Sequence, residues 1–169
     1  MTAPVVIFAV GNPSRGDDAL GPELCGRLEK WLENRGLAGQ VELVEDFQLQ
    51  IEHALDLAGR QLALFIDAGT GTPAPYSFRR IAPASGMAHT THALPPEAVL
   101  QVYVQTESQP PPPAYTLCLR GESFELGAGL SAAAEANLDK ACELLGRLLA
   151  APRLADWEAI ASAAGCGQT

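Results

Sequence analysis

Basic residues are few in this sequence. Only 11 lysines and arginines stand against 20 aspartates and glutamates, which gives a formal net charge of −9. An acidic protein repels phosphate backbones and anionic lipid headgroups. We therefore expect no nucleic acid and no membrane among its partners, and a basic or neutral partner fits the charge better. The simplest function of the acidity is to keep the protein soluble.

Long apolar runs and paired cysteines are also missing. No stretch approaches the roughly 18 uninterrupted apolar residues of a membrane-spanning helix, and the short apolar run near the N-terminus has no basic residue ahead of it, unlike a signal peptide. The four cysteines form no CxxC pair. We expect reduced thiols, most of them small core residues, in a cytoplasmic protein.

Alternating apolar patterns predict the fold. The 169 residues, 47% of them hydrophobic, suit one domain over residues 1–169 with a single core. Predicted strands cover residues 4–10, 41–45, 62–66, 76–81 and 115–120. Predicted helices begin near Asp17, cover residues 51–57 and 95–105, follow Ser131, and surround Trp157, with Trp31 and Trp157 expected in the core. This alternation is typical of a three-layer α/β sandwich, in which about five mainly parallel strands form a twisted sheet with helices on both faces.

Acidic side chains follow two of the predicted strands. Asp17 and Asp18 come after the loop that ends the first strand, and Asp67 directly follows the apolar run at 62–66. Ligands of open α/β sheets bind at the carboxyl ends of the strands, so these acids would meet at one rim of the sheet. His92, in the loop before the helix at 95–105, would supply a third group.

Two carboxylates and an imidazole have two chemical uses. They can bind a borderline divalent metal, or they can orient a water molecule and move protons during hydrolysis. Each residue also has a structural alternative: Asp18 as an acid at the positive end of a helix, Asp67 as a strand-end acid bonded to backbone amides, and His92 as a surface or capping residue. His53, in a predicted helix, is expected to make a local hydrogen bond rather than to act as a fourth ligand. Spacing alone leaves these alternatives open.

The segment GNPSRGDDALG at residues 11–21 resembles the signature of [NiFe]-hydrogenase maturation proteases, in which GN is followed by one or two acids and a glycine. Residues 6–10 are similar to the strand that precedes this signature, residues 66–68 to the family's second strand with its acid, and residues 91–94 to its histidine segment. Residues 45–53 differ from the glycine-rich segment common in the family. They are similar to the branch that serves NAD-reducing, bidirectional hydrogenases.

The resemblance implies an aspartic-type endopeptidase that removes the C-terminal extension of the hydrogenase large-subunit precursor after nickel insertion. By position, Asp18, Asp67 and His92 would be both the catalytic residues and the ligands of nickel. The nickel would arrive with its partner, the nickel-loaded precursor, and would not be a permanent cofactor. The family often has Glu where this chain has Asp18, whose side chain is shorter, and Asp17 is the second choice for this position.

Two other functions remain open. A serine or cysteine hydrolase on a similar fold would need a nucleophile at a strand-to-helix turn, but the sequence has no GxSxG motif and Cys25 lies inside a predicted helix. A non-proteolytic nickel-binding chaperone could use the same three residues. It would differ from the protease only in leaving the precursor uncut.

Overall fold

Five strands form a single sheet in the order β2-β1-β3-β5-β4. The computed structural model describes residues 2–84 and 94–166 of the chain. The strands are β1 (Val5–Val10), β2 (Val41–Asp46), β3 (Leu62–Gly69), β4 (Tyr76–Ile81) and β5 (Ala114–Arg120). All neighbouring strands are parallel except β4, which is antiparallel to β5 at one edge. The predicted mainly parallel, five-stranded sheet is confirmed.

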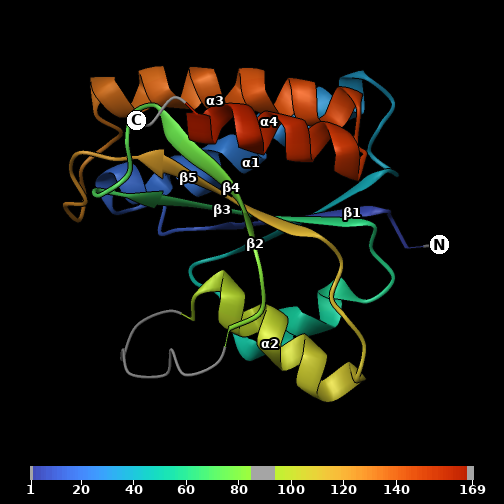
Figure 1. Cartoon of the computed structure of the whole chain (residues 1–169). Coiled ribbons are helices and arrows are strands. Elements are labelled where there is room, and N and C mark those ends of the chain that lie inside the picture. The colour runs from blue at the N-terminus through green and yellow to red at the C-terminus, as the bar shows by residue number, and fades with distance from the viewer. Residues whose placement is uncertain (1, 85–93, 167–169) are drawn as a thin grey trace.

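Helices cover both faces of this sheet. The α-helices are α1 (Leu20–Asn34), α2 (Pro96–Glu107), α3 (Ala132–Ala150) and α4 (Leu154–Cys166), and the 3-10 helices are η1 (Gly16–Ala19) and η2 (Ile51–Leu57). Helices α1, α3 and α4 lie on one face, and α2 packs with η2 on the other, which confirms the three-layer α/β arrangement (Figure 1). Within the described ranges, no helix combines the length and apolarity needed to cross a bilayer.

The sheet buries apolar side chains on both faces. All six residues of β1 are buried, and they alternate between two clusters: Val5, Ile7 and Ala9 face α1 and α3, and Val6, Phe8 and Val10 face α2 and η2. Continuous apolar runs are typical of parallel strands that are covered on both sides. The central strands are therefore fixed in place, and their carboxyl ends form a rigid edge for side chains from the following loops.

Helix α1 begins directly after η1 and packs a leucine face on the sheet. Leu20, Leu24, Leu28 and Leu32 recur every fourth residue and are all buried. The helix ends at Asn34, before Gly36 at a φ of 68°. The boundaries agree with the helix predicted between Asp17 and Gly36.

The two tryptophans differ in their environment. Trp157, on α4, is fully buried, and its indole N–H donates to the Leu148 carbonyl at 2.9 Å. The prediction that Trp31 belongs to the core was wrong. Trp31 is only partly buried at the margin of the core, and the Arg35 guanidinium lies 4.9 Å from the centre of its ring. Helix α4 is also longer than the short helix that we expected around Trp157.

Candidate functional site

The order of the strands defines one edge at which a ligand would bind. From β1, the chain continues to β2 on one side, whereas β3 and β5 lie on the other, so the connections reverse direction between β1 and β3. In open α/β sheets, ligands bind outside the carboxyl ends of the strands at such a switch point. Asp18 follows β1 and Asp67 lies near the end of β3, so both acids stand at this point.

The loop after β1 folds back tightly to present Asp18. Gly11 has a φ of 150°, and a Cβ at this position would stand 2.0 Å from the backbone oxygen of Asp18, so only glycine fits. The next residue, Asn12, donates its backbone N–H to the Asp18 carboxylate at 2.7 Å. The carboxylate is therefore oriented by the same turn that the glycine permits, and it remains only partly buried.

Asp67 is exposed, although many protein atoms surround its carboxylate. Its carboxylate accepts the N–H of Ala68 at 2.7 Å, and its side chain still reaches solvent. Protein atoms nevertheless crowd the group, and this desolvation raises the pKa of Asp67 to about 6, opposed by the Ala68 hydrogen bond and reinforced by the negative charge of Asp18. Although the side chain reaches solvent, the crowding by protein atoms and the repulsion by the negative charge of Asp18 both raise the pKa of Asp67. Asp18 and Asp67 are thus close enough for their charges to interact.

The third predicted residue, His92, lies outside the described residues, as does His89. Within residues 2–84 and 94–166, no group of three or more His, Cys, Asp and Glu side chains is placed to hold a metal ion. The structure therefore brings together Asp18 and Asp67 of the predicted set.

A cleft opens beside Asp67, on the face of the sheet that carries α2. Its volume is about 430 Å³, and its apolar lining includes Phe8, Val10 and Phe65. The rings of Phe8 and Phe65 stack with 4.7 Å between centroids, so this wall is rigid. A cleft of this size accepts a short stretch of polypeptide next to Asp67.

Cys118 also lines this cleft, although no sequence motif predicted a role for it. The register of the sheet places it opposite Asp67, and its thiol lies 2.9 Å from the Thr72 hydroxyl. Desolvation raises the pKa of Cys118, and the charge of Asp67 adds to this rise. Cys118 is therefore a neutral wall of the cleft and not an activated thiolate.

Asp17, the second choice for the site, has a structural role. It is fully buried and accepts hydrogen bonds from the backbone N–H groups of Glu122, Ser123 and Ser131 and from the Ser131 hydroxyl, at 2.7 to 3.1 Å. Burial alone would raise the pKa of Asp17, but these four donors together hold it below its ordinary value. Asp17 thus fastens the loop after β5 to η1, next to Asp18.

His53 makes local contacts, as its sequence context predicted. Its Nδ1 accepts the backbone N–H of Gln50 at 2.9 Å and caps η2, which fixes the remaining proton on Nε2. That Nε2 lies 3.4 Å from a carboxylate oxygen of Asp46, at the end of β2. Because both ring nitrogens have partners within the chain, His53 is not available as a metal ligand.

Comparison with known proteins bears on the fold. No model of a known protein family matches the sequence, and no curated protein is significantly similar to it. Solved structures do match. A [NiFe] hydrogenase maturation protease HycI from Thermococcus kodakarensis KOD1 superposes with a TM-score of 0.65 at 23% identity, over 88% of this chain and 92% of that one.

Two structures from E. coli are similarly close. The hydrogenase maturating endopeptidase HybD has a TM-score of 0.63 at 21% identity, over 83% of this chain and 88% of its own. A further endopeptidase, solved in solution, has a TM-score of 0.64 at 25% identity, with the same coverage of 83% and 88%. The chain therefore has the fold of hydrogenase maturation proteases over nearly its whole length.

Proposed function

We propose that this protein is an endopeptidase that removes the C-terminal extension of a [NiFe]-hydrogenase large-subunit precursor after nickel insertion. The observation that carries the proposal is the placement of Asp18 just after β1 and of Asp67 near the end of β3, the two strands on either side of the switch point. The fold shared with solved maturation proteases supports it. The precursor would be a protein partner, which suits an open edge with a cleft beside it.

In this mechanism, nickel belongs to the precursor and is part of the substrate. Asp18 and Asp67, with His92 as the third ligand, would hold the nickel-loaded centre and so place the scissile peptide beside a carboxylate. A carboxylate takes a proton from water, the water oxygen attacks the scissile carbonyl carbon, and the C–N bond breaks as the proton passes to the leaving amine. We assign Asp67 as the base because it lines the cleft in which the scissile peptide would lie. This assignment makes the enzyme an aspartic-type peptidase.

Two finer features belong to the same proposal. Residues 45–53 form the end of β2 and the start of η2, next to the switch point, and their resemblance to the branch that serves NAD-reducing hydrogenases supports a precursor of that class. Reduced cysteines support a cytoplasmic site of action, because Cys25, Cys118 and Cys142 are free thiols.

The test is incubation of the protein with nickel-loaded and with nickel-free precursor, followed by the mass of the precursor's C-terminus. We expect loss of one defined C-terminal peptide from the nickel-loaded form only. Failure to shorten either form would overturn the proposed activity. Equal shortening of both forms would keep the peptidase and remove nickel as the feature that it recognises.

A further inference from the structure

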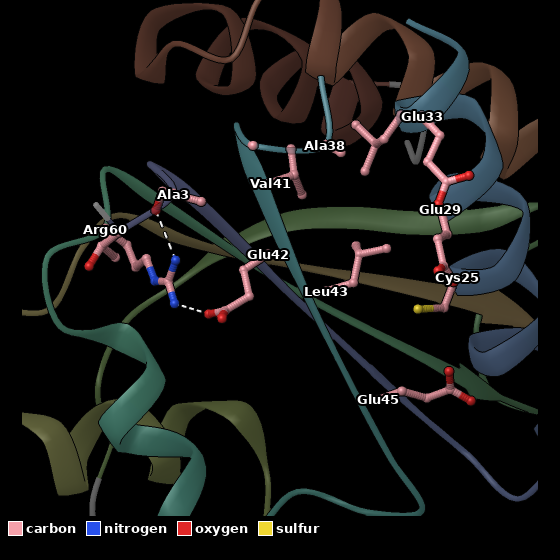
Figure 2. Close-up of a pocket in the computed structure, with 13 residues that line it drawn as sticks. Ala3, Cys25, Glu29, Glu33, Ala38, Val41, Glu42, Leu43, Glu45 and Arg60 are labelled. Atoms are coloured by element: carbon pink, nitrogen blue, oxygen red, sulfur yellow. Dashed lines mark hydrogen bonds and ion pairs between the residues drawn. The ribbon is translucent and has the colours of Figure 1, made fainter. Parts of the chain in front are cut away.

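A long groove runs along the outer edge of β2, away from the cleft beside Asp67. It has a volume of about 700 Å³ and lies between strand β2, helix α1 and the residues just before β1, which include Ala3 (Figure 2). It follows the strand from Val41 to Glu45, one residue before β2 ends at the switch-point edge. This is the shape that an extended polypeptide would fill.

The backbone of β2 is open along this groove. In the described part of the chain, β2 has a strand neighbour on one side only, β1. The ladder to β1 begins with the carbonyl of Gln40 and ends with that of Asp46. Since consecutive residues of a strand direct their N–H and C=O groups to opposite sides, Val41, Leu43 and Glu45 direct theirs away from β1. An added strand could pair with these three residues.

Carboxylates surround the open edge. Glu45, on β2, and Glu29 and Glu33, on α1, are exposed and line the groove, and no ion pair within the described residues involves any of them. The cation in the groove, Arg60, is already engaged by Glu42 and by the Ala3 carbonyl (Figure 2). The groove therefore carries negative charge that the protein itself does not neutralise.

Two of these carboxylates lie near the buried thiol of Cys25. Burial raises the pKa of Cys25 to about 11, and the charges of Glu45 and Glu29 contribute to this rise. Glu29 and Glu33 are also four residues apart on one helix, where like charges repel.

Charges on an edge strand can also serve only to prevent edge-to-edge pairing. A second copy of this chain would bring the same glutamates to the same edge, so self-pairing is disfavoured. A basic strand faces no such repulsion and gains from the same charges. The complementary occupant is therefore an extended segment with lysine or arginine side chains.

We propose that the outer edge of β2 binds an extended, basic segment of a partner protein as an added strand. Backbone pairing with Val41, Leu43 and Glu45 would supply most of the affinity, and cationic side chains on the α1 side would select the partner by contacting Glu29, Glu33 and Glu45. This binding is independent of the proposed cleavage and does not use Asp18 or Asp67.

The probe is a fluorescent octapeptide of alternating lysine and valine, added to the full-length protein at low salt. We expect binding that weakens as salt increases, and changes in the amide signals of Val41, Leu43 and Glu45 in NMR spectra. A glutamate-valine octapeptide should not bind, and a lysine-valine peptide N-methylated at every residue should lose at least about tenfold in affinity because neither of its edges can donate backbone hydrogen bonds.

The charges are tested with Glu29→Gln, Glu33→Gln and Glu45→Gln combined. We expect about a tenfold loss of affinity, the product of three exposed ion pairs. The matched control combines Glu107→Gln, Glu135→Gln and Glu143→Gln, which change the net charge equally and should alter affinity less than about twofold. Equal losses in the two variants would show non-specific attraction and overturn the proposal. Unchanged binding of the N-methylated peptide would also overturn it, and this measurement uses the unmodified protein. Absence of binding by the lysine-valine peptide would overturn it as well.

Discussion

Asp18, just after β1, and Asp67, near the end of β3, lie close enough for the charge of the first to reach the second. Desolvation is the larger cause of the raised pKa of Asp67, about 6, and the Asp18 carboxylate adds to it. The raised pKa makes Asp67 ready to accept a proton, and the repulsion between the two carboxylates lowers the stability of the protein when no cation is bound.

Asp67→Asn should therefore stabilise the metal-free protein at neutral pH. The folded pKa of Asp67 lies above the unfolded value of 3.8, so the folded state resists losing this proton. The gain should be complete above pH about 6 and should vanish below pH about 4. Because the side chain is exposed and screened by solvent, we expect at most about 1 kcal/mol. Urea unfolding with a chelator at pH 7.5 and pH 4 measures it, and an unchanged or lower stability at pH 7.5 would contradict the repulsion.

Asp17→Ala should destabilise the fold much more. It leaves the partly buried N–H groups of Glu122, Ser123 and Ser131 without their acceptor, and we expect a loss of about 3 kcal/mol. The matched control is Asp139→Ala, because Asp139 pairs with Arg27 at the surface and should cost less than about 1 kcal/mol. Since the pKa of Asp17 is lowered, its contribution is present at neutral pH and lost as the pH falls below the ordinary value of 3.8. Similar losses from the two variants in urea would refute the structural role of Asp17.

Two glycines on α1 provide a second matched pair. A Cβ on Gly21 would stand 2.3 Å from the backbone oxygen of Val10, whereas one on Gly26 meets nothing within 4 Å. Gly21→Ala should destabilise the protein by about 1–3 kcal/mol and displace the start of α1 from the end of β1. Gly26→Ala should stabilise it by about 1 kcal/mol through helix propensity. Thermal unfolding of both variants and of the parent measures these changes in stability. A Gly21→Ala variant as stable as the parent would contradict the close approach of α1 to β1.

Local patterns in the sequence predicted the elements of this fold well. The apolar runs that became β1 and β3 are visible without a structure, and so is the leucine spacing of α1. The order of the strands and the antiparallel direction of β4 were not visible, because they depend on contacts between distant segments. Trp31 was misplaced because an apolar helix face can end at the margin of a core, and only tertiary packing decides where the margin falls.

The candidate site could also be predicted only in part from the sequence. That Asp18 and Asp67 would share one edge follows from the rule for parallel strands, and the structure brings them together. The role of Asp17 could not be predicted, because its donors lie more than 100 residues away in the chain. Cys118 carried no signal either, since its place beside Asp67 depends on the register between β3 and β5.

The most direct test of the two carboxylates is cleavage of nickel-loaded precursor by Asp18→Asn and Asp67→Asn, each compared with Asp139→Asn. Both site variants keep the size of the side chain and remove the charge that would hold nickel and accept the proton. We predict that each lowers the rate of loss of the C-terminal peptide, followed by mass spectrometry, by at least about 100-fold, while Asp139→Asn cleaves at the rate of the parent. Cleavage at the parental rate by either site variant would contradict the account.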